Sequence, residues 1–253
     1  MLLSTSHMSW RSYSYSCFLF SGVLFDPLCP LWLTSSFGLS AKLQSRMKKT
    51  TENHGFTPAE LRKLRSLKDP HGIQRFIDDM PYHLADTAWS PRWVLRERTA
   101  HCLEGAIFAA AALRANGFPA LILDFEAEHD TDHVVAVYRV NGHWGAIAKS
   151  NFSGCRFREP VHRNLRELAI SYFNLYFNLR RERTLRTFSR PVNLARFDHL
   201  QWMTTEKPVW FIVYHLLEIF HYKLLRPGMA RRLHRVDERL FQAEVLGRAG
   251  KSG

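Results

Sequence analysis

The chain lacks the cysteine patterns of disulfide-stapled and zinc-finger domains. Its four cysteines are Cys17, Cys29, Cys102 and Cys155, and no two of them form a Cys-x-x-Cys pair. The chain also lacks an apolar run that could cross a bilayer, since the stretch from Cys17 to Phe25 is too short. We therefore expect reduced thiols, a cytoplasmic location and no transmembrane segment.

Acidic residues are scarce relative to basic ones. The chain has 23 Asp and Glu against 35 Lys and Arg, a formal charge of +12, which predicts attraction to anionic partners. One run of arginines contains a single acid, Glu182, and comprises Arg180, Arg181, Arg183, Arg186, Arg190 and Arg196. No base-stacking motif or zinc-finger spacing accompanies the run, which argues against nucleic acid as the partner. A non-enzymatic module that binds an anionic partner through its arginine-rich C-terminal half remains an alternative.

Residues 1–46 differ in composition from everything after them. They are rich in Ser, Leu and Phe, and their only acid is Asp26. Three interpretations stay open: a targeting segment, a poorly ordered extension, or a start-site artefact with Met47 as the functional start. The remaining residues, 47–253, have the length of a single globular domain.

Helix-start signals mark the first part of this domain. Thr57-Pro58-Ala59-Glu60 reads as a capping box with proline at the first helical position. A second short helix is predicted over Ile73–Met80, and Ser90-Pro91 begins a loop or a third helix.

The most informative stretch runs from Thr99 to Gly117. Its alanine-rich sequence favours a helix, with Thr99 as the expected N-cap and Gly117 as the stop. Cys102 then lies in the first turn, where the helix dipole stabilises a thiolate. A lone cysteine in such a helix is more often a small buried hydrophobe, so further evidence is needed to make it a nucleophile.

The period changes from helical to strand-like after Gly117. We expect a buried strand over 118–125, an acidic loop, and a hairpin whose strands flank Asn141-Gly142. Beyond residue 160 the pattern predicts a mainly helical portion, about 160–246, with helices near 162–178, 208–222 and 229–246. The fold class predicted is α+β, with a cysteine-bearing helix on an antiparallel sheet.

The order of parts fits a cysteine nucleophile with a nearby base. Cys102 begins the helix, and His133 opens a strand from which an imidazole can reach the sulfur. A third group must hold the other imidazole nitrogen. If Asn141-Gly142 is a simple two-residue turn, counting places Ser150 opposite His133, whereas a one-residue bulge places Asn151 there. We expect Asn151 to orient the imidazole, with Ser150 as the alternative.

These features resemble the transglutaminase-like superfamily of papain-type folds over about residues 90–152. The matching pieces are Cys102 with Ala106, Leu-Arg-x-x-Gly-x-Pro-Ala at 113–120, His133, and Gly-x-Trp at 142–144. The resemblance implies a Cys-His-Asp triad with protease, amidase or acyl-transfer activity. Where the family has its closing Asp, residues 148–151 contain no acid, so Cys-His-Asn is expected here.

The resulting hypothesis is a cysteine-dependent hydrolase or acyltransferase that acts on a peptide or protein amide and needs no cofactor. Its oxyanion donors would be the Cys102 backbone N–H and a side chain upstream, for which Trp89 and Trp93 are candidates. An inactive descendant that only binds a partner is the main alternative. A zinc site at His101, Cys102, His129 and His133 is a weaker one, because the two later histidines fall on a loop entering a strand.

Overall fold

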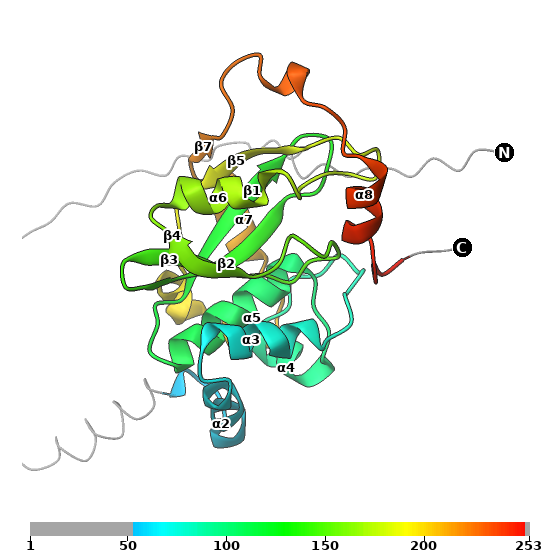
Figure 1. The fold of residues 1–253 in the computed structure, drawn as a ribbon. Helices are drawn as coiled ribbons and strands as arrows, with labels where there is room; N and C mark the ends of the chain where they lie inside the picture. Colours follow the sequence, from blue (N-terminus) through cyan, green and yellow to red (C-terminus); the bar gives the residue numbers. More distant parts are fainter. Residues whose placement is uncertain (1–52, 251–253) are drawn as a thin grey trace, which may run out of the picture. The chain divides into compact units, whose positions relative to one another are not determined.

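A computed structural model of the chain describes residues 53–250, and the expectations about residues 1–46 lie outside this part (Figure 1). The described residues form an α+β fold around a seven-stranded sheet in which every paired strand is antiparallel to its neighbour. None of the helices within this part has the length and hydrophobicity needed to span a bilayer.

The strand order across the sheet is β4-β3-β2-β1-β5-β7, with β6 paired to one end of β1. The strands are β1 (Leu121–Ala127), β2 (His133–Val140), β3 (His143–Ile147), β4 (Arg158–His162), β5 (Leu185–Ser189), β6 (Val192–Asn193) and β7 (His221–Lys223). The helices are α2 (Pro58–Ser66), α3 (Pro70–Asp78), α4 (Pro91–Glu97), α5 (Cys102–Ala115), α6 (Leu165–Phe173), α7 (Trp210–Glu218) and α8 (Glu238–Glu244), with 3₁₀ turns at Leu194–Leu200 and Ala230–Arg232.

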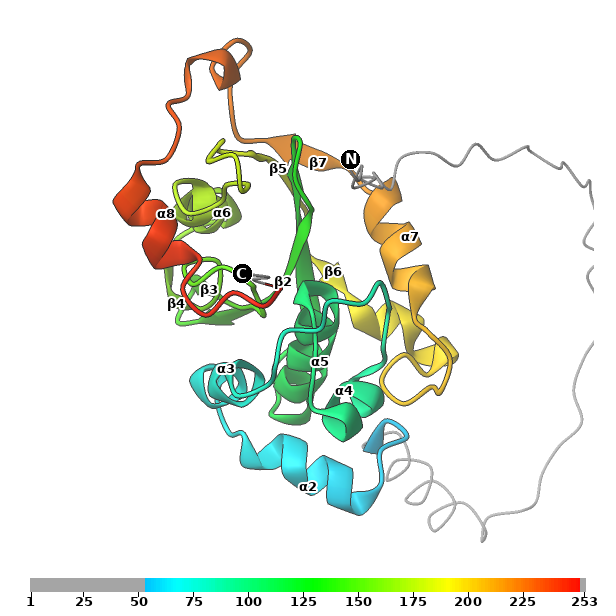
Figure 2. The ribbon, with the colours of Figure 1, turned by 90° about the vertical axis from the view of Figure 1, so that its right-hand side faces the viewer.

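Strand β2 is buried on both faces and separates two hydrophobic cores. Val134 and Ala136 belong to the larger core, which contains the buried side of α5 and residues of α2, α3, α4 and α7. Val135 and Val137 point the other way, into a smaller core with α6. The edge-on view of Figure 2 shows α6 and α7 on opposite sides of the sheet. Burial on both faces explains why β2 reads as an unbroken β-branched run.

Helix α5 is central because alanine lets it pack closely on all sides. Its residues from Leu103 to Leu113 are buried. Its N-cap is His101 rather than the predicted Thr99, whose hydroxyl instead donates to the Pro81 carbonyl (3.1 Å). The predicted first turn for Cys102 is confirmed, since Cys102 is the first helical residue.

The short helix predicted over Ile73–Met80 is present but runs from Pro70 to Asp78, because Asp69 caps it, whereas the predicted capping box and hairpin agree with the structure. The capping box of α2 is present, with Thr57 and Glu60 exchanging hydrogen bonds. The hairpin has Val140 opposite His143, and Asn141 and Gly142 both have positive φ, as a two-residue turn between twisted strands requires.

The prediction of a mainly helical portion after residue 160 is only partly correct. Four of the seven strands (β4 to β7) come from residues after 157, and β5 and β6 lie within the arginine run. The three predicted helices are shorter than expected. Helix α6 already ends at Phe173, and α8 begins only after its N-cap, Asp237. The chain between them continues the sheet on the far side of β1.

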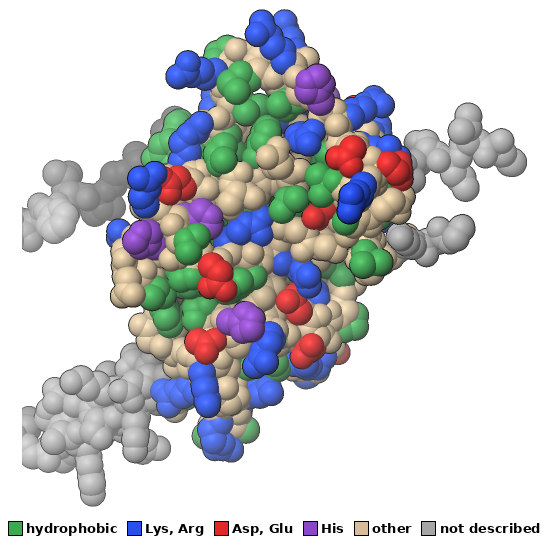
Figure 3. All heavy atoms as spheres, in the orientation of Figure 1, with side chains coloured by type: hydrophobic (Ala, Val, Ile, Leu, Met, Phe, Trp, Pro, Cys, Tyr) green, Lys and Arg blue, Asp and Glu red, His purple; other side chains and the backbone are tan. Residues whose placement is uncertain are grey.

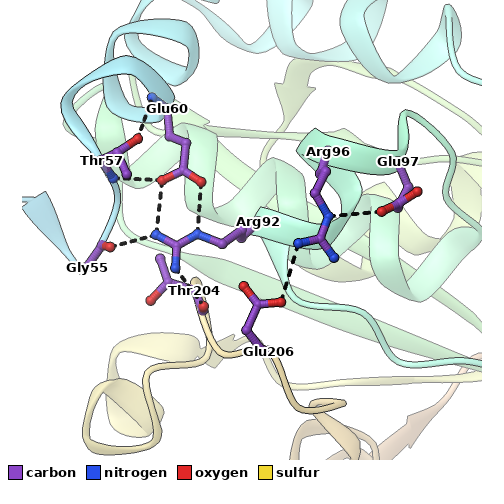
Figure 4. A network of polar contacts seen from close by, with 8 residues as sticks. All are labelled: Gly55, Thr57, Glu60, Arg92, Arg96, Glu97, Thr204 and Glu206. Carbon is purple, nitrogen blue, oxygen red and sulfur yellow. Dashed lines mark hydrogen bonds and ion pairs between the residues drawn. The ribbon is translucent and has the colours of Figure 1, made fainter.

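Helix α4, which leads toward α5, is fixed by one arginine. Figure 4 shows the Arg92 guanidinium between segments far apart in sequence. It forms a bidentate pair with Glu60 (2.8 and 3.0 Å) and donates to the carbonyls of Gly55 (2.8 Å) and Thr204 (3.0 Å). Such a planar fork satisfies several acceptors at once, so it orients α4 against α2 and the 200–205 segment.

The end of β3 is joined to α3 by buried polar contacts. Gln74 exchanges hydrogen bonds with the backbone of Ala148 (3.0 Å each), and the Lys149 ammonium donates to the carbonyls of Ile77 (2.8 Å) and Met80. Burial lowers the pKa of Lys149, and the carbonyls at the C-terminal end of α3 supply the hydrogen bonds of its charged form. Gly105 of α5 lies directly against this lysine, since a Cβ there would be 2.4 Å from Lys149 Cβ.

We expect Gly105→Ala to destabilise the fold, although alanine is the better helix former by about 1 kcal/mol. The added methyl must displace Lys149 from its carbonyls, and overpacking of this kind costs about 1–3 kcal/mol. Urea denaturation followed by circular dichroism measures the difference in the free energy of unfolding. A gain in stability would show that the contact between α5 and Lys149 is looser than described.

Candidate active site

Cys102 is the first residue of a 14-residue helix and is partly exposed. The position places its sulfur at the positive end of the helix dipole, which favours a thiolate. Its thiol lies 3.9 Å from the carbonyl oxygen of Asp132, the residue before β2. The N-terminus of α5 and the first residue of β2 therefore meet at one place.

Strand β2 brings His133 to this place. The imidazole is almost completely buried, and its Nε2 lies 3.0 Å from the carbonyl oxygen of Cys155. A carbonyl can only accept, so Nε2 carries the hydrogen and Nδ1 is the nitrogen left for the thiol. Phe125 stacks on the ring and Tyr176 meets it edge-on, which holds the ring plane. The structure therefore brings the predicted nucleophile and base together.

A second imidazole also interacts with the sulfur. Burial alone would raise the pKa of Cys102, but hydrogen bonds and charge interactions with His101 and His133 outweigh it. The net effect places the pKa of the thiol well below its ordinary value. A lowered thiol pKa favours the thiolate, the reactive form of a cysteine nucleophile.

His101 has its own anchor. Its Nε2 donates to the carbonyl oxygen of Thr87 (2.8 Å), and its backbone N–H donates to Glu104 (3.2 Å). Burial disfavours the charged ring, but the hydrogen bond and charge of Cys102, then Glu104 and Thr87, raise the pKa of His101 to about 9.

The Glu104 carboxylate, in the first turn of α5, is completely buried. It accepts four hydrogen bonds, from Thr87 Oγ1 (2.6 Å), His83 Nδ1 (3.0 Å), the Trp89 backbone N–H (3.1 Å) and the His101 backbone N–H (3.2 Å). Four such hydrogen bonds offset the free-energy cost of desolvating a buried carboxylate. The segment 83–89 is thereby held beside the start of α5.

Tyr82 occupies the place where an oxyanion donor is needed. Its phenol interacts with both the backbone N–H and the thiol of Cys102, and burial followed by the Cys102 charge raises its pKa above the ordinary value. A neutral hydroxyl beside that N–H can donate to a developing oxyanion. Of the two tryptophans considered earlier, Trp89 gives its backbone N–H to Glu104, and Trp93 lies under the Arg96 guanidinium.

The structure gives Asn151 and Ser150 partners other than the imidazole. Both amide atoms of Asn151 bond the backbone of Ala249 (2.8 and 3.2 Å), and Ser150 Oγ accepts from the Phe152 N–H (3.0 Å). The register that counts Ser150 opposite His133 is correct, but the β2–β3 ladder ends at Ala136 and Ile147. The chain diverges there, and the Cys155 carbonyl takes the orienting position instead.

Three residues of the site were not identified from the sequence. His101 was considered only as a zinc ligand, Glu104 was given no role, and Tyr82 was not considered. A capping signal for Glu104 was available, because it stands three residues after the observed N-cap. No local pattern indicates that residues 82–87 lie across the start of α5.

The arginine run is largely engaged within the chain. Its partners include Glu182 for Arg180, Glu238 for Arg181, the His234 carbonyl for Arg183, Glu128 for Arg186 and His215 for Arg196. On the face shown in Figure 3, basic side chains are spread out with acidic ones among them. These contacts favour a structural role for the run.

The four residues considered for zinc do not form a metal site, because His101 and His133 hold the Cys102 sulfur between them and His129 lies elsewhere. Within residues 53–250, no three His, Cys, Asp or Glu side chains are grouped so that they could hold a metal ion. His129 instead lines a polar cavity of about 260 Å³ with Arg183 and Arg235.

The sequence matches no known family model, and a search of curated proteins returns no significant match.

The two described cysteines should differ sharply toward iodoacetamide. Cys155 is buried, its thiol donates to the Leu175 carbonyl (3.3 Å), and burial raises its pKa, whereas Cys102 is partly exposed and its pKa is lowered. At pH 6 we expect Cys102 to be alkylated at least tenfold faster than a free thiol, whose pKa is about 8.5, while Cys155 stays unmodified. Peptide mass spectrometry over time measures both rates. Slow alkylation of Cys102 at pH 6 would contradict the thiolate.

Replacing the buried carboxylate should destabilise the fold even when its shape is kept. Glu104→Gln turns one acceptor into a donor that faces other donors, at a cost of about 1–3 kcal/mol. Glu206→Gln is the matched control, because its ion pair with Arg96 (3.5 Å) is exposed and is worth at most about 1 kcal/mol. Equal free energies of unfolding for the two variants would mean that Glu104 is not the anchor described.

Proposed function

We propose that this protein is a cysteine-dependent amide hydrolase or acyltransferase with a transglutaminase-like, papain-type core. The observation that carries the proposal is the meeting of Cys102, at a helix N-terminus, with a buried imidazole whose other nitrogen is held by a backbone carbonyl. This arrangement meets the requirements of thiol acyl transfer: an ionised nucleophile, a base within reach and a fixed tautomer.

In the proposed reaction the Cys102 thiolate attacks the carbonyl carbon of an amide. The carbonyl oxygen becomes an oxyanion that accepts from the Cys102 N–H and the Tyr82 hydroxyl. When the C–N bond breaks, the His133 imidazolium gives its proton to the leaving amine, and a thioester remains on Cys102. Water, or a second amine in acyl transfer, then gives a proton to His133 and attacks the thioester. The products are a carboxylic acid or a new amide, and the thiolate–imidazolium pair is restored.

The rival function, an inactive module that binds an anionic partner, has weaker support. Its arginines are mostly committed to intramolecular partners. A solely structural site would also have no use for an ionised thiol, since a buried neutral cysteine packs as well.

Acylation by p-nitrophenyl acetate tests the proposal without knowledge of the natural substrate. We expect a burst of p-nitrophenolate close to one equivalent of enzyme and acetylation of the Cys102 peptide. Cys102→Ser should abolish the burst, and His133→Gln should slow it by a factor of about 10²–10⁴, the usual contribution of a general base. Hydroxylamine at neutral pH should then release the acetyl group from Cys102, as it does from a thioester.

Cys155→Ala is the matched control, since it removes the other described cysteine without touching the sulfur of Cys102. A burst that survives Cys102→Ser, or no burst in the natural protein, would overturn the proposal.

A further inference from the structure

His101 stands immediately before the nucleophile, at the N-cap of α5. Its ring contacts the Cys102 sulfur, so the thiol has an imidazole on each side, one from the helix cap and one from β2. A single imidazole is enough for the proton transfers of thiol acyl chemistry. The second one therefore needs its own explanation.

The two rings differ in how they are held. His133 is fixed by one carbonyl, that of Cys155, and by aromatic contacts. His101 is fixed through its ring by Thr87 and through its backbone by Glu104, whose carboxylate also lies 3.6 Å from Nε2. A buried carboxylate within this distance gives the His101 imidazolium a permanent counter-charge.

We infer that His101 is a second catalytic imidazole that stays protonated and holds the Cys102 thiolate, while His133 carries the proton that moves. The inference rests on the proposed function and deepens it by dividing the work between the two rings. The proton of the Cys102 thiol passes to His133, and none passes to or from His101. When the sulfur is acylated and loses its charge, Glu104 still balances the His101 ring. In deacylation the same ring favours departure of the sulfur as a thiolate.

Other charged or titratable groups also face this pair. They come from the segment before α4, from α5, from β1 and β2 with the loop between them, and from the segment after α6. They are Tyr82, His83, Glu104, Asp124, Asp132, His133 and Tyr176. Among these, His133 is the other group that stabilises the thiolate through a hydrogen bond. Variants at the two histidines can therefore separate their roles.

The test is the pH dependence of iodoacetamide alkylation at Cys102, read by mass spectrometry and by the ultraviolet absorbance of the thiolate. His101→Gln keeps a donor for the Thr87 carbonyl but cannot carry a charge. We expect its alkylation midpoint to rise by at least one pH unit, which lowers the rate about tenfold at pH values below both midpoints. His133→Gln should retain thiolate at pH 6, and the double variant should titrate near the free value of about 8.5.

His83→Gln is the matched control, because His83 also contacts Glu104 and stacks on His101 at 6.0 Å. Its alkylation midpoint should move much less than that of His101→Gln, because the hydrogen bonds to the Cys102 sulfur come from His101 and His133. If it shifted as much as His101→Gln, the effect would come from a disturbed Glu104 network, and the inference would fail. Circular dichroism and continued protection of Cys155 verify that each variant is folded.

The acetylation burst provides the second measurement. At a pH above its new midpoint, His101→Gln should retain a burst rate within about tenfold of the natural protein, whereas His133→Gln should not. The inference would be overturned if the alkylation midpoint of His101→Gln were unchanged. It would also be overturned if His133→Gln lost the thiolate while His101→Gln kept it. Alkylation needs no substrate, so these outcomes are distinguishable from failure of the proposed function, which appears as a missing burst on an intact thiolate.

Discussion

The candidate site depends on one buried carboxylate. Glu104 stands on α5, yet its hydrogen bonds tie down the 83–89 segment and the backbone of His101. They add to the hydrogen bonds that the His101 ring and the Ala100 carbonyl make with Thr87 and His83. The Glu104 carboxylate thus supports the chemistry of Cys102 through the residues that it holds in place, without contacting the sulfur itself. A buried charge with all its bonds made is costly to alter, which gives the surrounding geometry its precision.

Features that depend on a few consecutive residues were predictable. The first-turn position of Cys102 follows from the alanine-rich run and its stop at Asn116-Gly117, and the hairpin follows from Asn141-Gly142. The pairing of Cys102 with His133 was also predictable, because thiol chemistry needs a nearby imidazole and His133 opens a strand from which its side chain can reach the helix start. The helices after residue 160 were predicted less well, since caps and sheet pairing there override the helical pattern.

Features that depend on distant segments were not predictable. The group that orients His133 is a backbone carbonyl at Cys155, and any residue type can supply a carbonyl, so no side-chain pattern marks it. Asn151 was chosen on chemistry alone, but the chain leaves the sheet before reaching it and its amide pairs with Ala249. The places of Tyr82 and Thr87 depend on a loop that crosses to α5, which single-sequence reasoning cannot fold.

The ends of the sheet bear on how this molecule meets others. One outer strand, β4, contains Pro160, which offers no N–H, and the other, β7, has only three residues (Figure 1). An edge that is short or interrupted by proline is a poor template for a strand from another chain. The long, hydrophobic strands β1 and β2 lie inside the sheet, away from such encounters. Strands β1 and β2, which could pair most readily with a strand of another chain, are thus separated from the sheet edges, where the poorly pairing strands β4 and β7 lie.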